Sequence, residues 1–275
     1  NGSGSDWTNA CTDFIGSCAV SSLIRGHTYY VAGGTYGSRT FNTPESGTSV
    51  ITIKGATAAD HGTDTGWQSS FGVDVTQATF SHGSSEWAIV VSTSYWVFDG
   101  SVGSGNTASS YGFLVEKPSN CSMSPQGGMW VGKVGGTLTS VTIKHIAYIS
   151  CGVSFNTTQR GFGIGCGNCY VTNSTWANNL IDGPSNCLSG TNFTDTIFER
   201  NWCQNQWSSP ANHGATFAFT NCHNLDYAGC STAFPQGQGT INNTFRYNII
   251  KGCRGTACLD AIGPGNVLSM NSWKI

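Results

Sequence analysis

The sequence predicts an all-β protein built as a single parallel β-helix, a solenoid in which successive turns of the chain stack. The first observation is a short phrase that recurs every 21 to 28 residues, clearest as Phe198-Glu199-Arg200-Asn201 and Phe245-Arg246-Tyr247-Asn248. Weaker copies begin at Ile143, Val171 and Phe219. The second observation is that the linking segments are rich in Gly, Asn, Ser and Thr and have no helical spacing. Such a period is typical of a solenoid, in which neighbouring turns of the chain together bury a core that no single turn could bury alone. A β-sandwich with similarly spaced strands is the alternative.

The elements are expected in the following order. Residues 1–22 are Gly- and Ser-rich and are predicted to cap the open edge of the first rung. Residues 23–275 are predicted to form the β-helix domain, because no boundary of composition divides them. Strand-forming residues cluster at residues 25–36, 50–54, 87–91 and 95–98, and the repeated phrases follow from residue 143 to about residue 262. The tail from residue 265 is apolar and has little that looks like a polar cap.

Composition excludes several classes of protein. Only 9% of the residues are charged, against a usual share of about 25%. The 38% hydrophobic and 12% aromatic residues are enough to bury a core, which argues against disorder. A net charge of −2 with scattered Lys and Arg leaves no footprint for nucleic acid, so none is expected as a partner. No apolar run approaches the roughly 20 residues of a membrane-spanning helix.

Twelve cysteines, an even number, indicate an oxidising compartment, and we expect an extracellular or cell-surface protein stapled by disulfides. The absence of Met or a signal peptide before Asn1 agrees with a processed or trimmed form. Cys166 and Cys169 are spaced like half of a zinc site, but no second half follows, so disulfides are favoured. Cys11 and Cys18 are the expected local pair; the remaining connectivity is open. The predicted disulfide cysteines are Cys11, Cys18, Cys121, Cys151, Cys166, Cys169, Cys187, Cys203, Cys222, Cys230, Cys253 and Cys258.

Four phrases in the first hundred residues resemble one protein family. They are residues 25–31, 51–57, 60–67 and 95–100, and the likeness extends over about residues 23–262. The chain resembles secreted right-handed parallel β-helix proteins of the pectate-lyase-like superfamily, in a branch whose members are mostly uncharacterised. This resemblance implies a right-handed β-helix. The characterised enzymes of the superfamily are lyases and hydrolases of polysaccharides, but a shared fold does not transfer an activity.

Catalytic candidates follow from that chemistry. A lyase of uronic acids needs cations beside the sugar carboxylate and a base for the α-proton. The nearest match is Glu199 and Arg200 with Arg246 one phrase later, plus Lys251 and Arg254, although a solvated outer face explains the same pattern. His213, in a loop, is a weaker candidate base. The adjacent aspartates and the Gly-His-Gly phrase of the superfamily's hydrolases are absent, and no carboxylate pair for glycosidic cleavage is convincing.

No cofactor or metal is expected, except Ca²⁺ if the protein is a lyase, since clustered aspartates hold that ion in the calcium-dependent members. Asp60 and Asp64 are the weak candidate ligands. Their surroundings, Asp60-His61-Gly62-Thr63-Asp64, also read as a turn, and the turn is favoured.

Asparagines have two predicted roles. Asn173, Asn201, Asn221 and Asn248 lie at or next to equivalent positions of the phrase and are predicted to form a hydrogen-bonded ladder. Asn-x-Ser/Thr sites are candidate N-glycan acceptors, and a glycan at Asn173 would weaken the ladder prediction. These sites are Asn1, Asn120, Asn156, Asn173, Asn192 and Asn242.

Three functions remain open. The first is an extracellular structural protein that assembles end to end with copies of itself into a fibre or surface layer, because an open solenoid end exposes unpaired strands. The second is a polysaccharide lyase or glycoside hydrolase acting in the outer groove of the β-helix. The third is a non-catalytic glycan-binding module whose exposed aromatic residues stack on sugars. Candidate platforms are Trp67, Trp87, Trp207 and Trp273.

Overall fold

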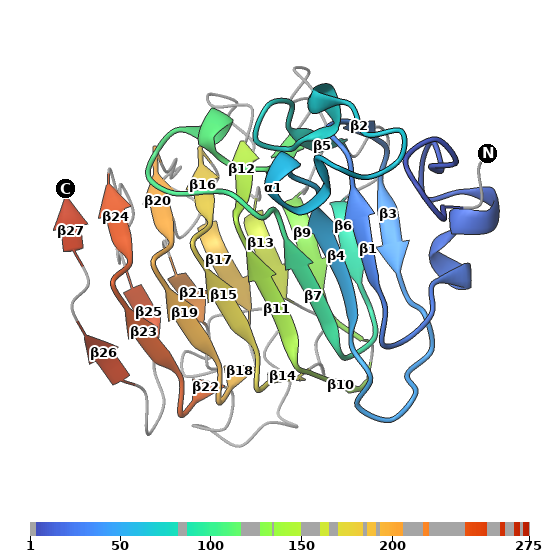
Figure 1. The fold of residues 1–275 in the computed structure, drawn as a ribbon. Coiled ribbons are helices and arrows are strands. Elements are labelled where there is room, and N and C mark those ends of the chain that lie inside the picture. Colours follow the sequence, from blue (N-terminus) through green and yellow to red (C-terminus); the bar gives the residue numbers. More distant parts are fainter. Residues whose placement is uncertain are drawn as a thin grey trace.

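Parallel strands are the main regular element of the structure (Figure 1). Every pair of neighbouring strands is parallel. An all-β architecture is therefore confirmed for the residues that this computed structural model describes. These are residues 4–81, 87–116, 127–133, 135–149, 160–164, 170–183, 186–190, 193–205, 217–219, 240–251, 259–261, 267–269 and 272–274.

The strands form four sheets, which we call A to D. Sheet A contains, in spatial order, β1 (Thr28–Val31), β4 (Ile51–Gly55), β7 (Trp96–Asp99), β11 (Val141–Lys144), β15 (Thr175–Ala177), β19 (Ile197–Glu199), β23 (Thr244–Arg246) and β26 (Val267–Ser269). Sheet B contains β2 (Gly34–Tyr36), β5 (Ala78–Ser81), β8 (Phe113–Glu116), β12 (Ile146–Ile149), β16 (Leu180–Asp182), β20 (Trp202–Gln204), β24 (Ile249–Lys251) and β27 (Ser272–Lys274).

Sheets C and D complete the arrangement. Sheet C contains β3 (Arg39–Phe41), β6 (Trp87–Val91), β9 (Gly127–Val131), β13 (Arg160–Ile164), β17 (Asn186–Gly190), β21 (Phe217–Phe219) and β25 (Leu259–Ala261). Sheet D contains β10 (Thr137–Thr139), β14 (Tyr170–Thr172), β18 (Phe193–Thr194) and β22 (Thr240–Ile241). The helices are short: α1 (Ala58–His61) and the 3-10 turns η1 (Gly16–Cys18), η2 (Val20–Ser22), η3 (Ser69–Phe71) and η4 (Ala108–Ser110).

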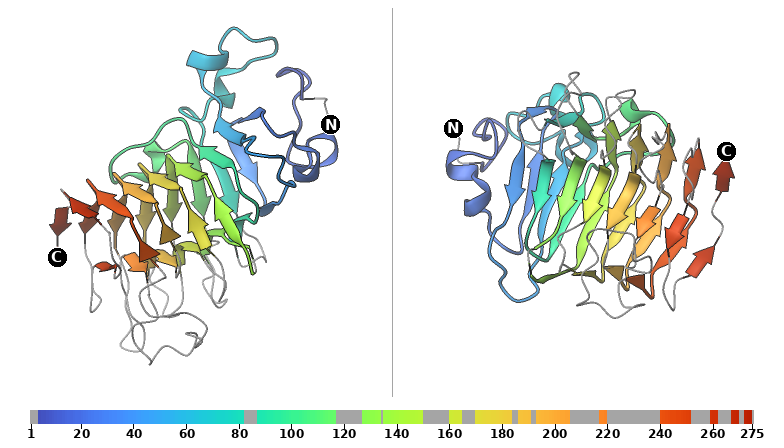
Figure 2. Two further views of the ribbon diagram at one scale, coloured as in Figure 1. Left: turned by 90° about the horizontal axis from the view of Figure 1, so that it is seen from below. Right: turned by 180° about the vertical axis from the view of Figure 1, so that it is seen from behind.

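The chain visits the sheets in rotation. After β11 in sheet A it forms β12 in sheet B, β13 in sheet C and β14 in sheet D, and it then returns to sheet A as β15 beside β11. Each passage, which we call a circuit, therefore lies against the circuits before and after it. The termini of the chain lie at opposite ends of the sheets (Figures 1 and 2).

Alternation along the strands builds the core. In sheet A one column of buried residues runs from β4 to β23 and stacks from circuit to circuit: Ile53, Phe98, Ile143, Trp176, Phe198 and Phe245. The rings of Trp176 and Phe198 stack with centroids 5.5 Å apart, and those of Phe198 and Phe245 with centroids 4.9 Å apart. Such pairs add to the stabilisation that burial of the rings already provides.

Left-handed residues make the corners between sheets A and B. His145, Asn178, Arg200 and Tyr247 have φ angles of 57°, 53°, 52° and 58°. Each is the first residue after a strand of sheet A; it turns the chain alone before β12, and together with the Asn that follows it before β16, β20 and β24. A second column makes the corners between sheets D and A, at Ser140, Asn173, Asp195 and Asn242. Asparagine tolerates this conformation better than most residues, which explains its frequency at these positions.

A ladder of buried amides joins the corners between sheets A and B. Asn201 donates from Nδ2 to the Trp176 carbonyl (2.9 Å) and to Oδ1 of Asn248 (3.0 Å). Its own Oδ1 accepts from the main-chain N–H and the Nδ2 of Asn179, at 3.2 and 3.0 Å. Asn179 in turn donates to the Ile143 carbonyl. The ladder is therefore continuous over the described circuits from β11 to β23.

The ladder confirms the predicted roles of Asn201 and Asn248 but not that of Asn173. Asn173 is exposed at a corner between sheets D and A, so the phrase that starts at Val171 belongs to a different corner from the others. The true equivalent is Trp176-Ala177-Asn178-Asn179, whose Asn179 the sequence comparison missed. Phe219 ends a strand of sheet C, and Asn221 lies outside the described residues.

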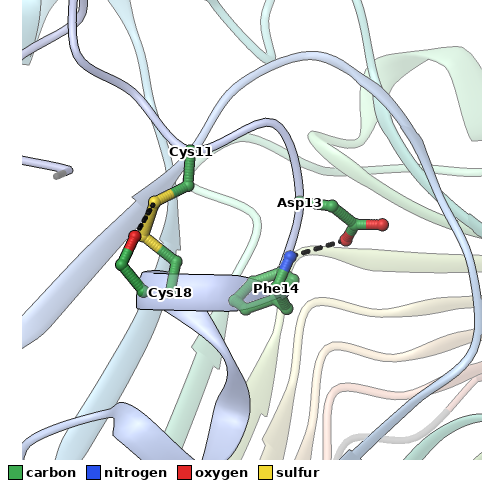
Figure 3. The surroundings of a disulfide bond; sticks show 5 residues. Cys11, Asp13, Phe14 and Cys18 are labelled. Atoms are coloured by element: carbon green, nitrogen blue, oxygen red, sulfur yellow. Dashed lines mark hydrogen bonds between the residues drawn. A yellow bond between two sulfur atoms is a disulfide. The ribbon is translucent and has the colours of Figure 1, made fainter. Parts of the chain in front are cut away.

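The N-terminal segment covers the end of the core. Val20 and Leu23 are buried in the main hydrophobic cluster, and the ring of Phe14 packs on Phe41 with centroids 5.5 Å apart. Cys11 and Cys18 form the predicted disulfide in this segment, next to Phe14 (Figure 3). Asp13 forms an ion pair with Arg39 of β3. These contacts pack the segment against the first strands, and its role as a cap stays a prediction.

The ladder makes Asn201 critical for stability. The change Asn201→Ala should lower the free energy of unfolding by about 3 kcal/mol, because it leaves buried donors and acceptors on both neighbouring circuits without partners. Chemical denaturation would measure this. The exposed Asn42 is a control, and Asn42→Ala should change the same quantity by less than about 0.5 kcal/mol. Similar effects for the two variants would show that the ladder does not stabilise the fold.

Candidate functional site

A row of polar side chains crosses the outer face of sheet A. The strand register aligns one residue from each strand of sheet A from β1 to β23. From β4 onward, each of these residues directly follows the buried residue of its strand. Adjacent strands are about 4.8 Å apart, so these residues lie on one line. We call them the charged row: Tyr30, Lys54, Asp99, Lys144, Ala177, Glu199 and Arg246.

Asp99 holds the first cluster of the row together. Its Oδ2 lies 3.0 Å from Nζ of Lys144, and its Oδ1 lies 2.7 Å from Nδ1 of His145. The main-chain N–H of Ser101 also donates to Oδ1. Burial of Asp99 would raise its pKa, but the hydrogen bonds from His145, Lys144 and Ser101 outweigh burial and lower the pKa to about 2.

Lys54 continues the row toward α1. Its Nζ donates to Oδ2 of Asp60 at 2.8 Å and lies 5.7 Å from the ring centroid of Tyr30. The hydrogen bond raises the pKa of Lys54 and lowers the pKa of Asp60. Asp64 is bound elsewhere, with Oδ2 2.8 Å from Nδ1 of His61. Asp60 and Asp64 therefore have different partners, and the described residues contain no group of three His, Cys, Asp or Glu side chains arranged to hold a metal ion.

Glu199 forms the second cluster, which brings together three residues singled out from the sequence. Its Oε1 lies 3.0 Å from Nη1 of Arg200, and its Oε2 lies 2.7 Å from Nε of Arg246. The guanidinium of Arg200 also lies over the ring of Tyr247, 5.4 Å from its centroid. One carboxylate thus orients two arginines on neighbouring circuits.

In both clusters the cations lie outside the carboxylates. The side chains of Asp99 and Glu199 are 11% and 15% exposed, whereas those of Lys144, Arg246 and Arg200 are 36%, 41% and 54% exposed. A ligand that approaches the row meets the positive groups first. Lys54, Lys144, Arg200 and Arg246 are four of the twelve Lys and Arg residues, and they outnumber by one the three carboxylates that pair with them, Asp60, Asp99 and Glu199.

Three corner residues beside the row have strained backbones. His145, Arg200 and Tyr247 adopt left-handed φ angles. Asn178 occupies the equivalent corner of the circuit between those of His145 and Arg200. Such a conformation costs on the order of 1 kcal/mol or more for residues other than Gly and Asn. Strain of this kind clusters at functional sites. At these corners, side chains able to bind or react stand where Asn or Gly would be easier to accommodate.

Other predicted site residues have the following places. His213 lies outside the described residues, as do Cys121, Cys151, Cys166, Cys169, Cys222, Cys230, Cys253 and Cys258 and the sequon residues Asn1, Asn120, Asn156 and Asn192. Cys187 is buried, with Sγ 3.9 Å from the Ile181 carbonyl, and Cys203 is buried and forms no disulfide with a described residue. Asn173 and Asn242 are exposed, so their glycosylation stays a prediction.

Asp99, Lys144 and His145 were missed by sequence reasoning as a site. Asp99 is separated from Lys144 by a segment that includes η4, β8, β9 and β10, so no local spacing links the two. The available signal was the phrase Ile143-Lys144-His145-Ile146. Aligned with Phe198-Glu199-Arg200-Asn201, it puts Lys144 in the row of Glu199.

Comparisons with known proteins identify no relative: no family model, no curated protein and no solved structure matches this chain. The resemblance to the pectate-lyase-like superfamily therefore stays a prediction. No helix in the described part of the chain is long and apolar enough to cross a membrane.

Stability in acid should depend on Asp99. The pKa of this group is about 2 in the folded protein against 3.8 for an ordinary Asp, so the unfolded chain takes up the proton first as the pH falls. The resulting stabilisation, complete above about pH 5, should fall by about 2 kcal/mol by pH 2.

Denaturation of Asp99→Asn across this pH range would test the prediction. Its free energy of unfolding should lack that part of the pH dependence, while the exposed control Asp195→Asn should keep it. Equal pH profiles for Asp99→Asn and the wild type would contradict the assignment.

Proposed function

We propose that the circuits form a single right-handed parallel β-helix of the pectate-lyase-like class. The rotation of the chain through parallel sheets supports this architecture, because each circuit adds one strand to the same sheets. Parallel crossovers within one sheet are right-handed in about 98% of cases. The Cys11–Cys18 disulfide supports the proposed extracellular location.

We further propose that the protein binds an acidic polysaccharide along the charged row. The observation that carries this proposal is the exposure of the cations above the carboxylates that orient them. Uronate or sulfate groups of a glycan would pair with Lys144, Arg200 and Arg246. Because Asp99 and Glu199 hold these cations in place, less side-chain freedom is lost on binding than for free surface cations.

Aromatic rings at both ends of the row add a second kind of contact. Tyr30 and Tyr247 are each 42% exposed. Amphipathic rings of this kind present an apolar face and a polar tip, which suits the faces and hydroxyl groups of sugars. The strand spacing of about 4.8 Å repeats along the row, so an extended chain of sugars would meet a new row residue at each successive circuit.

A polysaccharide lyase is the second candidate, favoured by the Asp99–His145 hydrogen bond. In such a reaction a base removes the proton α to the uronate carboxylate, a carbon–carbon double bond forms, and the glycosidic oxygen leaves with its electron pair. His145, oriented through Nδ1, is the candidate base, and Lys144 is the candidate cation for the uronate carboxylate. The proton gained by His145 would pass to solvent or to the leaving oxygen.

Binding should depend on the cations of the row. Lys144→Gln and Arg246→Gln should each weaken binding to polygalacturonate about fivefold, because each removes one charge pair of about 1 kcal/mol. Calorimetry at low salt would measure the dissociation constants. Lys251→Gln, which changes an exposed cation of sheet B, should bind as the wild type does. Equal affinity of the wild type for a neutral glucan would rule out the charge-based site.

Lyase activity has a separate readout. The wild type should generate unsaturated uronate products from polygalacturonate, detected by their ultraviolet absorbance. His145→Gln should abolish this product while binding persists, because Gln cannot serve as the base. Polysaccharide binding without any unsaturated product in the wild type would leave the protein as a binding module and remove the lyase candidate.

A further inference from the structure

A cleft of about 560 Å³ lies between the N-terminal segment and the first circuit. Trp7 and Phe71 stack on one side of it, with ring centroids 5.7 Å apart, and Tyr30 and His61 pack edge to face at 4.1 Å. Residues of β1 and β2 form its floor. The N-terminal segment and the α1 segment project beyond the sheets at this end (Figure 2, left).

The floor of the cleft includes a free strand edge. The carbonyls of His27 and Val31 accept hydrogen bonds from Thr52 and Ala56, so alternate residues of β1 face β4. Thr28 and Tyr30, the residues between them, direct their main-chain groups away from β4 and toward the cleft. Neither main-chain group of Thr28 or Tyr30 has a hydrogen-bond partner among the described residues.

Free edge groups of this kind are a template for another strand, which would pair with them through main-chain hydrogen bonds. The aromatic rings along the cleft would cover the side chains of such a strand. The charge of the cleft selects among possible strands. Its lining contains Asp6, Asp13 and Asp64 and no Lys or Arg. Asp13 pairs with Arg39 and Asp64 with His61, which leaves Asp6 as the carboxylate that favours a strand carrying positive charge.

The opposite end of the same sheets offers a matching pair of strands. β26 is the last described strand of sheet A and β27 that of sheet B, while β1 and β2 are the first. β26 and β27 follow each other along the chain as β1 and β2 do, and β27 ends at Lys274. A second copy displaced along the sheets keeps all strand directions, so its β26 would meet β1 in the parallel sense used throughout the sheets.

We propose that a second copy of this chain places β26 and β27 in the cleft, against the free edges of β1 and β2. The contact is confined to sheets A and B, because Phe14, Val20 and Leu23 cover the end of the core. It is therefore small, and association is expected to be reversible. A head-to-tail contact that does not close continues into a filament, which is the fibre predicted from the sequence. This inference rests on the strand edge and the cleft and not on the cations of the row; Tyr30 is the row residue that also lines the cleft.

Sedimentation of the intact protein over a range of concentrations would test the proposal, with electron microscopy of the concentrated sample. The wild type should form head-to-tail oligomers as concentration rises. Thr28→Pro removes a main-chain donor that faces only the cleft, so it should weaken association at least tenfold and leave the thermal unfolding midpoint close to that of the wild type. The matched control Thr28→Ala keeps the donor and should associate as the wild type does.

Two further measurements keep the test decisive if Thr28→Pro is unstable. A synthetic peptide of residues 265–275 should inhibit association of the wild type, and a scrambled peptide should not. Asp6→Asn should weaken association about threefold without loss of stability, since Asp6 lies in an exposed part of the segment. A wild type that stays monomeric at every concentration would overturn the proposal. So would a peptide of residues 265–275 that fails to inhibit association, or an Asp6→Asn variant that associates as the wild type does. None of these outcomes bears on the polygalacturonate measurements.

Discussion

The amide ladder of Asn179, Asn201 and Asn248 determines where sheet A ends and sheet B begins. Asn179 and Asn201 each satisfy main-chain groups of the circuit before and are held by the amide of the circuit after, and Asn248 donates to the Phe198 carbonyl of the circuit before it. Because these groups are buried, the loss of one amide would leave several others without partners. The left-handed residue before each ladder position is then fixed in direction, and so is the strand residue before that. The ladder on the inside therefore holds the charged row in place on the outside.

This coupling explains how a protein with few charges can organise a charged surface. Each circuit contributes one residue to the row, and the next residue in the sequence forms the corner beside it. Where a circuit supplies Ala177 and Asn178, the surface is neutral; where it supplies Glu199 and Arg200, or Lys144 and His145, ion pairs form across circuits. Function in such a framework can change at two positions per circuit, while the buried neighbours Ile143, Trp176 and Phe198 keep the core unchanged.

Sequence reasoning reached the all-β class through the copies that share a corner, those beginning at Ile143, Phe198 and Phe245. It also brought Glu199, Arg200 and Arg246 together, because those copies align the residues one circuit apart. It failed at Val171, whose phrase has the same polar pattern but ends at a corner between sheets D and A. The cluster around Asp99 was not predictable by spacing, since insertions of very different length separate its strands. The strand edge at Thr28 was not predictable either, because the order of strands in space decides which edge is free.

Strand length changes along the molecule and gives it a direction. Strands β4, β7 and β11 of sheet A contain four or five residues, whereas β15, β19, β23 and β26 contain three. Within sheet A, fewer main-chain hydrogen bonds therefore tie the late strands to their neighbours, whereas β13 and β17 of sheet C keep five residues each. In a linear stack, where each unit contacts only adjacent units, such a gradient makes one end open more often than the other. Amide hydrogens of the late circuits would exchange with solvent through local fraying. Those of the early circuits would exchange more slowly, because their exchange requires larger openings of the structure.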